Sequence, residues 1–443
     1  MKVVADLQLH SKYSRAVSPQ MMIPYIWDWA KRKGIGLIAT GDWTHPLWMR
    51  EIKANLIEDG SGLLKLKAEE EGPLFLLATE ISSIYSQGGK GRRIHNLIWA
   101  PSLITADKIT QELIRRGANL ISDGRPIVGL TSIQIAELVF SIDPSCLIIA
   151  AHCWTPWFSL YGSESGFDSI DECFGQFAKN IYAVETGLSS DPAMNWRIKE
   201  LDNRSILSFS DAHSGPKLGR EATVFELKEL SFEAIRRAIM NQSDNKIIYT
   251  IEFYPEEGKY HWTGHRNCGI KQKPEETRKN GTQCPVCGRK LTVGVMHRVD
   301  DLAGRSEEEL RLSVVINKLS DDGIDVRMTK SDAFPNRPPY VNMVPLQEII
   351  AETIGGLPTS QKVQDEYRKL TDGLGSEFRV LLESSIPGIT NISGERIAQA
   401  IHKVRIGDIV VDPGYDGVFG KVKIWEEKKE QKPQDEKKQL SFF

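Results

Sequence analysis

The sequence lacks any apolar run long enough to cross a membrane. Its 443 residues contain no stretch of about 18 apolar side chains, which argues against a membrane-spanning helix. The first residues, Met1–Asp6, bring a charged side chain into an apolar segment, so we expect no secretory leader there. Together these absences predict a cytoplasmic protein with no membrane partner.

Cysteine and net charge are also scarce. The chain has six cysteines, and Cys146, Cys153 and Cys173 are scattered in the first half, where we expect reduced thiols. Lysine and arginine number 56 against 59 aspartates and glutamates, a formal net charge of −3. Any binding of nucleic acid must therefore use local basic patches. No glycine-rich loop of the Walker or dinucleotide-binding type is present, so nucleotide cofactors are not expected.

Composition divides the chain into four segments, and its length suggests two or three domains. Residues 1–245 alternate apolar, strand-like runs with amphipathic segments, which is typical of an α/β fold with a parallel sheet or barrel. Residues 246–297 are rich in glycine, lysine and turn residues and predict a small module. Residues 298–425 predict a helical C-terminal domain that binds DNA, and residues 426–443 a polar, disordered tail. The helices expected in that domain are Glu307–Leu319, Leu346–Ile354, Gln361–Lys369 and Gly394–Val404.

Side chains that bind metal ions stand at the ends of six apolar runs in residues 1–245. In a parallel α/β barrel the strand ends converge on one face, so these side chains should meet in space. A single such residue is more often a strand-end cap or a core polar group, but six strand ends in succession favour a metal cluster. Imidazoles with bridging carboxylates are what such a cluster needs to hydrolyse a phosphate ester. The candidate ligands are Gln8, His10, Asp42, Glu80, His95, His152, Asp211 and His213.

The order of these motifs resembles the PHP (polymerase and histidinol phosphatase) family, and Asp211-Ala212-His213 is among its more specific parts. The resemblance covers residues 1–245 and implies a distorted (β/α)7 barrel that holds three metal ions. It implies one metal held by Gln8, His10, Glu80 and Asp211, a second by Glu80, His95 and His152, and a third by Asp42 and His213. It also implies catalytic roles for Asp211 and Glu80.

Two positions depart from the family pattern. The first motif usually reads His-x-His, and here Gln8 stands at the first histidine; an amide oxygen is a weaker ligand than imidazole for zinc or manganese. The second motif usually has His directly after Asp, and here Trp43 follows Asp42, so we assign Asp42 alone. Glu185 ends another apolar run, and both a catalytic outer-shell base and a strand-end cap stay open for it.

A separate set of metal ligands lies in residues 246–297. His265 and Cys268 are followed, after fifteen residues, by Cys284-Pro285-Val286-Cys287-Gly288. A Cys-Pro-x-Cys-Gly knuckle points backbone amides at its thiolates, and two half-sites complete a tetrahedron. We therefore predict a structural zinc site of His265, Cys268, Cys284 and Cys287, with His261 as a competing ligand. Zn²⁺ is expected here and in the catalytic cluster, where Mg²⁺ and Mn²⁺ are alternatives.

Cations and aromatic rings suggest where nucleic acid binds. The zinc module carries Arg266 and Arg289 among interleaved aromatics, and the glycine-rich segment before His95 carries Lys90, Arg92 and Arg93. Cations for phosphates and rings for stacking are typical of a nucleic-acid interface, although a solvated face over core aromatics has the same composition. Aromatics after the metal motifs are candidate platforms for an exposed base or packing residues of the barrel rim: Trp43, Trp48, Trp154, Trp157 and Tyr161. Of these we assign Trp154 to DNA binding.

The full arrangement resembles the endonuclease Q family over residues 1–425: a PHP barrel, a zinc module containing Gly264-His265-Arg266-Asn267-Cys268, and a helical C-terminal domain. That resemblance implies a DNA repair endonuclease that nicks double-stranded DNA 5′ to deaminated bases (uracil, hypoxanthine, xanthine) and abasic sites. A deaminated base pairs poorly, so flipping it out of the stack costs less. Two alternatives stay open: a small-molecule phosphatase of the histidinol-phosphate type, and an inactive DNA- or clamp-binding scaffold, which Gln8 favours.

The chain ends in Gln439-Leu440-Ser441-Phe442-Phe443. A terminal pair of aromatics preceded by Leu and Gln resembles the peptide that docks on the sliding clamps of replication. Gln439 holds the place where that peptide has an aliphatic residue, and an arbitrary terminus is the alternative. The resemblance implies a sliding clamp as a second partner.

Overall fold

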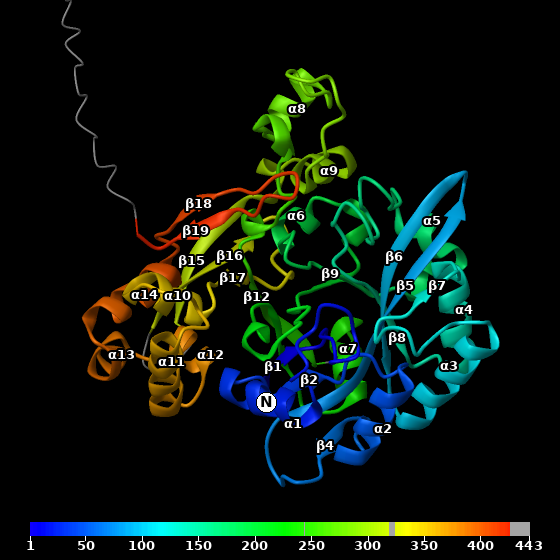
Figure 1. Ribbon diagram of the computed structural model, residues 1–443, viewed down its shortest axis with the longest axis horizontal. Helices are drawn as coiled ribbons and strands as arrows, with labels where there is room; N and C mark the ends of the chain where they lie inside the picture. Colours follow the sequence, from blue (N-terminus) through cyan, green and yellow to red (C-terminus); the bar gives the residue numbers. More distant parts are fainter. Residues whose placement is uncertain (243, 319–323, 426–443) are drawn as a thin grey trace, which may run out of the picture.

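The computed structural model describes residues 1–242, 244–318 and 324–425. Its architecture is a mixed α/β fold built around a large sheet of 15 strands, with helices packed beside it (Figure 1). The peptide Gln439–Phe443, predicted to bind a clamp, lies outside the described residues. None of the helices described is both long and apolar enough to span a bilayer.

The strands of the N-terminal part form a row that curls back on its start. Only the two pairs that involve β6 (Lys90–Ala100) are antiparallel; the other neighbours run parallel. The segment after β10 (Ser205–Leu207) lies beside the segment after β1 (Lys2–Asp6), because the amide of His10 donates to the carbonyl of Ala212 at 3.0 Å. The order of the row is β10 (Ser205–Leu207), β9 (Ala183–Glu185), β8 (Leu147–Ala150), β6 (Lys90–Ala100), β5 (Leu74–Gln87), β2 (Leu37–Ala39) and β1 (Lys2–Asp6).

Short buried runs build these strands. β2 and β8 read Leu-Ile-Ala and Leu-Ile-Ile-Ala, and every side chain in them is buried. A strand covered on both faces needs no polar alternation, which explains the continuous apolar runs in the sequence. The helices of this part are α1 (Ile23–Lys33), α2 (Pro46–Asn55), α3 (Leu103–Arg115), α4 (Ser132–Ile142), α5 (Ile170–Phe174), α6 (Pro192–Trp196) and α7 (Phe232–Ile239).

Helix α1 shows how local sequence sets these helices. A proline lies in its first turn, where the missing N–H costs nothing, and Gly34 ends it with a φ of 87°. Ile23, Ile26 and Ala30 are buried along one face at helical spacing. The helix therefore packs one apolar stripe against the sheet.

The sheet continues past β1 into the C-terminal segment. β11 (Ala222–Glu226) pairs with β1, and β12 (Lys246–Glu252), β17 (Tyr340–Asn342), β16 (Asp325–Ser331) and β15 (Leu312–Lys318) follow in that order. Three short strands lie off this order. β4 (Leu64–Leu66) and β7 (Ile127–Val128) pair with β5, and β3 (Leu56–Glu58) pairs with β4. One hydrophobic core thus extends from the first segment into the third.

The helix predicted over Glu307–Leu319 is wrong, because strand β15 occupies most of it. Val314, Val315 and Ile316 are β-branched and fit a pleated strand better than a helix. β15 pairs with β16 along its whole length, which satisfies its backbone on that side. The C-terminal segment is therefore not purely helical.

The remaining C-terminal elements form a group of helices followed by a small hairpin. A buried ion pair fixes this group to α1, with Lys33 Nζ 2.6 Å from Glu377 Oε2. The predictions for Leu346–Ile354, Gln361–Lys369 and Gly394–Val404 fall on α10, α11 and α14, with small differences at the ends. The elements are α10 (Leu346–Ile354), α11 (Gln361–Leu374), α12 (Glu377–Leu382), α13 (Ile386–Ser393), α14 (Glu395–Ile406), β18 (Val410–Asp412) and β19 (Lys421–Lys423).

The module predicted to bind zinc projects from the body beside the C-terminal hairpin (Figure 1). It consists of β13 (Thr263–His265), β14 (Ile270–Gln272), α8 (Pro274–Asn280) and α9 (Val295–Leu302). β13 and β14 form their own antiparallel pair apart from the large sheet.

Candidate metal centre

Two groups of potential metal ligands lie where the N-terminal strands converge. Glu80, His95 and His152 form one group, and His10, Asp211 and His213 form the other; within each group the ligand atoms lie within 4.8 Å of one another. His10, His152, Asp211 and His213 lie a few residues beyond strand ends, as the sequence pattern predicted. Glu80 and His95 correct that pattern, because they lie in the interior of the long strands β5 and β6. Six side chains separated by up to 203 residues therefore lie close enough together to hold ions.

Glu80 connects the two groups. Its Oε2 lies 3.5 Å from Nε2 of His10, and its Oε1 lies 3.6 Å from Nε2 of His152 and contacts Nδ1 of His95. Nε2 of His10 is also 3.2 Å from Oδ1 of Asp211. A carboxylate between two sets of imidazoles has the position of a bridging ligand.

The donor set fits divalent cations. Oε1 of Gln8, Nε2 of His10 and Oδ1 of Asp211 are buried and, among the described residues, have no hydrogen-bond partner of acceptable geometry. Burial of such atoms without a partner costs free energy that a bound cation would offset. Burial also lowers the pKa of His95 to about 4, so this imidazole is neutral and has a lone pair for a cation.

Backbone strain marks the same site. Asp42, His152 and Asp211 have positive φ angles of 43°, 29° and 46°, which non-glycine residues seldom adopt. All three lie two to four residues beyond strand ends of the curled row. Conformations of this kind persist when the surrounding structure over-determines them, and they concentrate at functional sites.

Asp42 does not pair with His213 in a third ligand group, which corrects that part of the sequence-based assignment. Its Oδ1 is 2.9 Å from Nδ1 of His10, and its Oδ2 accepts hydrogen bonds from Ser11 and Ser14 at 2.6–2.8 Å. A carboxylate bonded to the far nitrogen of a ligating histidine fixes the tautomer and orientation of that ring. Asp42 therefore supports His10, and His213 belongs with His10 and Asp211.

Gln8 lies inside the site. Its amide nitrogen donates to Oε2 of Glu80 at 2.8 Å, which turns its carbonyl oxygen, Oε1, away from that carboxylate. The glutamine therefore orients Glu80 and leaves one oxygen for a cation.

Glu185 has the contacts of a strand-end cap. Its carboxylate accepts the backbone N–H groups of His152 and Gly187, the latter at 2.8 Å. Burial raises the pKa of Glu185 to about 7. A side chain at position 187 would meet the Cβ of His152 at 2.4 Å, so the turn requires glycine there. These contacts hold the strained backbone of His152, and they favour the cap over the base.

Arg125 is a residue of the site that sequence reasoning missed. Its guanidinium lies 3.3 Å from Oε1 of Glu80. Burial opposes its charge, but Glu80 and Asp211 outweigh burial and raise the pKa of Arg125. It stands in an irregular segment between α3 and β7 without a metal-binding motif, and no sequence signal marks it.

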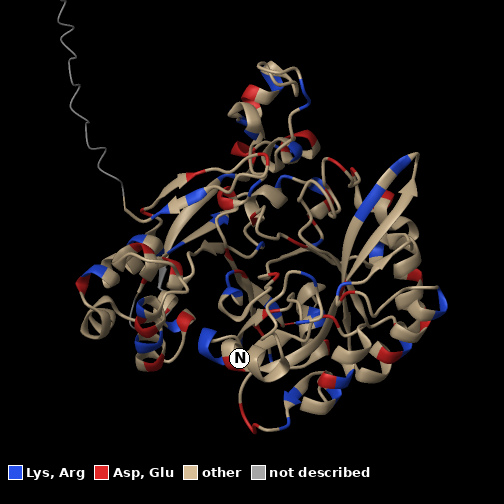
Figure 2. Ribbon diagram, in the orientation of Figure 1, with Lys and Arg blue, Asp and Glu red and all other residues tan. Residues whose placement is uncertain are grey.

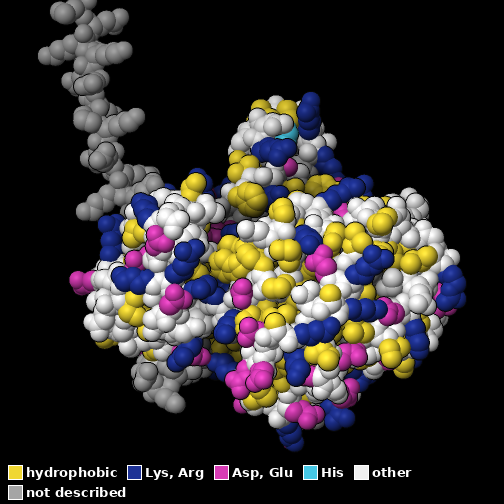
Figure 3. Space-filling view, turned by 60° about the horizontal axis from the view of Figure 1, so that its bottom comes forward, with side chains coloured by type: hydrophobic (Ala, Val, Ile, Leu, Met, Phe, Trp, Pro, Cys, Tyr) yellow, Lys and Arg dark blue, Asp and Glu magenta, His cyan; other side chains and the backbone are white. Residues whose placement is uncertain are grey.

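The predicted DNA-binding cations of the first segment lie on a ribbon formed by β5 and β6. Lys90 and Arg93 are exposed on its outer half, where basic residues gather in Figure 2. Arg92 is instead part of the packing, because its guanidinium stacks 4.0 Å from the Phe167 ring and donates to the carbonyl of Gly166. On the face seen in Figure 3, cations and acids are interspersed, in keeping with the small net charge.

Most aromatic candidates for a stacking platform are buried. Trp154 is 1% exposed, packs on Tyr161 and donates to Asn195 at 2.8 Å. Trp43 and Trp48 are fully buried. The assignment of Trp154 to DNA binding is therefore not supported, because its ring does not reach the surface.

His265, Cys268, Cys284 and Cys287 come together in the small module as predicted, with their ligand atoms within 4.8 Å. Burial opposes ionisation of Cys284, but the amides of Cys287 and Val286 outweigh it and lower the thiol pKa to about 6. This is the arrangement of a knuckle that presents amides to a thiolate. His261 is buried outside this group, so His265 is the fourth ligand candidate.

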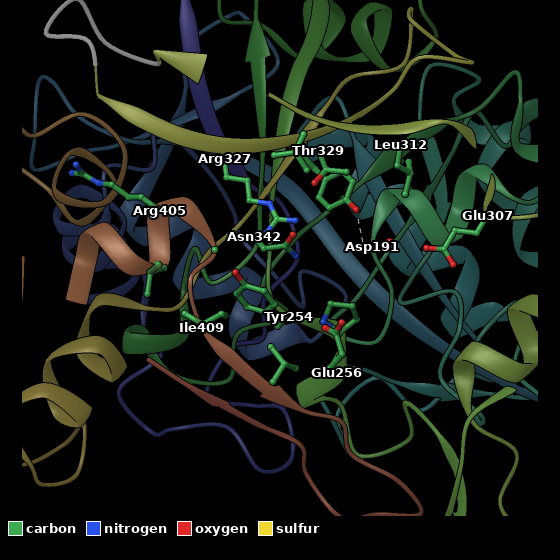
Figure 4. A pocket seen from close by; sticks show the side chains of 16 residues that line it. Asp191, Tyr254, Glu256, Glu307, Leu312, Arg327, Thr329, Asn342, Arg405 and Ile409 are labelled. Atoms are coloured by element: carbon green, nitrogen blue, oxygen red, sulfur yellow. Dashed lines mark hydrogen bonds between the residues drawn. The ribbon is translucent and has the colours of Figure 1, made fainter. Parts of the chain in front are cut away.

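A separate cavity of about 430 Å³ lies between α14, the β15–β17 strands and the chain around Tyr254. Figure 4 shows Arg327, Asn342 and Tyr254 facing its centre, while Arg405 points away from it. Asp191 forms part of its wall and accepts a hydrogen bond from Tyr340 at 3.3 Å. None of the metal-centre residues lines this cavity.

The chain is similar to proteins whose structures are solved. It is 33% identical to the lesion-specific endonuclease PfuEndoQ from Pyrococcus furiosus, over 98% of both chains and with a TM-score of 0.80. It is 34% identical to an endonuclease Q crystallised with a 27-mer duplex substrate carrying an abasic lesion at the active site; the match covers 98% of this chain and 100% of that chain, with a TM-score of 0.80.

Two further matches involve a protein of Methanocaldococcus jannaschii. The family model described as the MJ0043 C-terminal domain matches residues 345–408, which hold helices α10 to α14. The uncharacterized protein MJ0043 itself is 34% identical over 286 residues, 63% of this chain and 32% of that protein. This match spans about one third of that relative. Because identity to the Pyrococcus enzyme extends over nearly the whole of both chains, this chain belongs to the endonuclease Q family of endonucleases.

Proposed function

We propose that this protein is a metal-dependent DNA repair endonuclease that nicks the phosphodiester bond 5′ to deaminated bases (uracil, hypoxanthine and xanthine) and abasic sites. The observation that carries the proposal is the pair of ligand groups connected by Glu80, in a chain of the endonuclease Q family. An endonuclease Q structure with a duplex that carries an abasic lesion supports the choice of substrate.

The curled row of strands is, in this proposal, the distorted barrel of the PHP type. Zn²⁺, with Mg²⁺ or Mn²⁺ as alternatives, would be held by His10, Asp211 and His213 and by Glu80, His95 and His152, with Gln8 contributing its free oxygen. Such ions lower the pKa of a bound water and stabilise charge on phosphate oxygens.

The protein's own groups prepare this site. Asp42 holds the ring of His10, and Gln8 donates to Glu80, so both ligands are oriented in advance. Arg125 places a positive charge beside Glu80, where the negative phosphate has to approach. Lys90 and Arg93 on the ribbon, and Arg266 and Arg289 in the zinc module, are exposed cations for the duplex backbone.

The decisive experiment uses labelled duplexes that each carry one uracil, one hypoxanthine or one abasic site, incubated with the protein and Mn²⁺, Mg²⁺ or Zn²⁺. We expect a single nick on the 5′ side of the lesion and an intact control duplex. Release of phosphate from small monoesters without nicking would indicate a phosphatase of the histidinol-phosphate type. Binding of the duplexes without cleavage would indicate an inactive scaffold.

Replacing Arg125 with Gln is expected to lower kcat/KM for a uracil duplex about thirtyfold, because a hydrogen bond to a charged group contributes about 2 kcal/mol. The measurement is steady-state nicking over a range of duplex concentrations. Arg116→Gln is the control, since Arg116 is the residue that caps the C-terminal end of helix α3 and it pairs with Glu112 of that helix. Equal kcat/KM for Arg125→Gln and wild type would exclude Arg125 from the site.

Deleting Gln439–Phe443 is expected to leave nicking of a short duplex unchanged and to abolish binding to a sliding clamp. The two phenylalanines would contribute about 3 to 6 kcal/mol if buried in a pocket of the partner, enough for a micromolar contact. Calorimetry with the purified clamp measures this affinity for both chains. Equal affinities would show that the terminal peptide is not the docking element.

A further inference from the structure

Phe158 lies against the metal centre although no sequence pattern singles it out. Its ring centroid is 4.9 Å from that of His95, with the two planes tilted by 42°. The guanidinium of Arg93, two residues before His95 on strand β6, lies 5.5 Å from the ring centre. The side chain is partly buried, in contrast to Trp43, Trp48 and Trp154. Phe158 is thus a partly exposed residue whose ring lies next to a candidate ligand.

The backbone of Phe158 is strained. Its φ is 64°, in the left-handed region where a bulky residue is an outlier and glycine is the usual occupant. Strain of this kind persists only where neighbouring contacts impose it. Glycine at this position would relieve the strain. Backbone geometry therefore does not explain why the residue is a phenylalanine.

Contacts with the ribbon and within its own loop hold Phe158 in place. Its carbonyl accepts the amide of His95 at 3.2 Å, and its amide donates to Ser165 at 3.3 Å. The same loop is bonded across itself, with the amide of Glu164 donating to the carbonyl of Pro156 at 3.0 Å. The ring is therefore presented at a fixed position beside His95.

The zinc module supports this loop from the opposite side. Arg298 of helix α9 donates to the carbonyls of Tyr161 and Phe167 at 2.9 and 3.1 Å. Lys290 lies 3.3 Å from Glu164, and the Trp157 ring meets that of Tyr260 edge-on at 5.7 Å. The loop is thus enclosed by the ribbon, the metal centre and the module.

We propose that Phe158 is the platform on which a flipped lesion base stacks, and that it makes the enzyme favour lesions that retain a base over abasic sites. This inference rests on the proposed function. A nucleotide whose 5′ phosphate lies at the metal centre would bring its base close to His95, and the ring of the partly buried Phe158 lies against that histidine. Every base has a flat π face, so one phenyl ring serves uracil, hypoxanthine and xanthine alike.

Arg93 completes the arrangement. Its guanidinium lies over the Phe158 ring and is exposed, so it can bind a neighbouring phosphate while the ring contacts the base. An abasic nucleotide has no base to stack and gains nothing from the ring. Cleavage of base-containing lesions should therefore depend on the Phe158 side chain, and cleavage of abasic sites should not.

The test compares Phe158→Leu, Phe158→Gly and Phe158→Tyr with wild type on uracil, hypoxanthine and abasic duplexes of otherwise identical sequence. We expect the Leu and Gly variants to lose about tenfold to a hundredfold in kcat/KM on the base-containing lesions, the range of one base–aromatic stack. On the abasic duplex they should stay within about twofold, and Tyr should restore wild-type rates on all three.

Phe158→Gly guards against misfolding, because glycine adopts a φ of 64° without strain. Metal content by mass spectrometry should equal that of wild type in every variant. Phe140→Leu is the matched control, since Phe140 packs on Phe177 on the outer helices, and its rates should not change.

Two results would overturn the inference. Equal losses on base-containing and abasic duplexes, or loss of metal, would mean that Phe158 only packs against His95. Unchanged rates on all duplexes would mean that the ring does not contact DNA. If wild type itself nicks no lesion, it is the proposed function that fails, and this outcome is distinct from the other two.

Discussion

Replacing Asp211 with Asn is expected to lower the rate of nicking at a lesion by about a thousandfold or more, with little change in affinity for the duplex. Oδ1 of Asp211 lies 3.2 Å from Nε2 of His10 in a buried site. A neutral amide there would remove the charge that the proposed cation needs, and with it several kcal/mol of transition-state stabilisation, at about 1.4 kcal/mol for each factor of ten. Single-turnover nicking and fluorescence anisotropy measure the two quantities.

Asn suits this position because it tolerates the left-handed backbone better than most residues, and φ of Asp211 is 46°. The fold should therefore survive the substitution. Asp244→Asn is the matched control, since Asp244 is 76% exposed and pairs with Lys228 on the surface. Activity of Asp211→Asn within about tenfold of wild type would refute the metal assignment.

Replacing Cys284 and Cys287 together with Ala is expected to remove one equivalent of bound metal, unfold the small module and weaken duplex binding. A structural zinc ion supplies about 10–16 kcal/mol to such a module, more than its few buried apolar residues can replace. Metal analysis of the purified protein, thermal unfolding and anisotropy measure the three effects. Losing the ordered cations of the module should weaken binding about tenfold at moderate salt.

A control variant separates this effect from general damage by thiol removal. Cys146→Ala with Cys173→Ala removes two buried thiols of the first segment that lie outside every ligand group among the residues described. Its metal content should equal that of wild type. Equal zinc content in the Cys284/Cys287 variant and wild type would show that these cysteines hold no ion.

The module also contacts the loop that lies beside the candidate metal centre. Arg298 bonds two carbonyls of the loop that carries Phe158, and Lys290 lies beside Glu164 of that loop. Unfolding of the module should therefore loosen the loop as well as weaken DNA binding. The proposed zinc site and the candidate metal centre share no ligand, but one loop contacts both regions.

The ligand types, and the placement of most of them just beyond strand ends, were predictable from sequence. His10, His152 and Asp211 follow buried apolar runs, Glu80 and His95 lie inside the strands β5 and β6, and the structure brings all five together. Local pattern is sufficient here because a buried strand requires continuous apolar residues and then ends where polar ones begin. The Cys-Pro-x-Cys-Gly knuckle was predictable for a similar reason, since its geometry is contained in five consecutive residues.

The partners of these ligands were decided by the tertiary structure. Asp42 has the residue type of a ligand, but its carboxylate is hydrogen-bonded to His10, Ser11 and Ser14. Whether a carboxylate faces the cluster or the far nitrogen of a histidine depends on the path of two strands, about 30 residues apart in the chain, relative to each other. The same holds for Arg125, which reaches Glu80 from a loop that no motif marks.

Sequence by itself thus determined which residues of this protein are candidate metal ligands, where the module predicted to bind zinc lies and that the fold is α/β. The tertiary structure decided that residues 312–318 form a strand, that Trp154 is core, and that Phe158 stands beside His95. The physical reason is that residue type and local periodicity act over a few neighbouring residues. Burial, exposure and the choice of hydrogen-bond partner depend instead on which distant segments pack together.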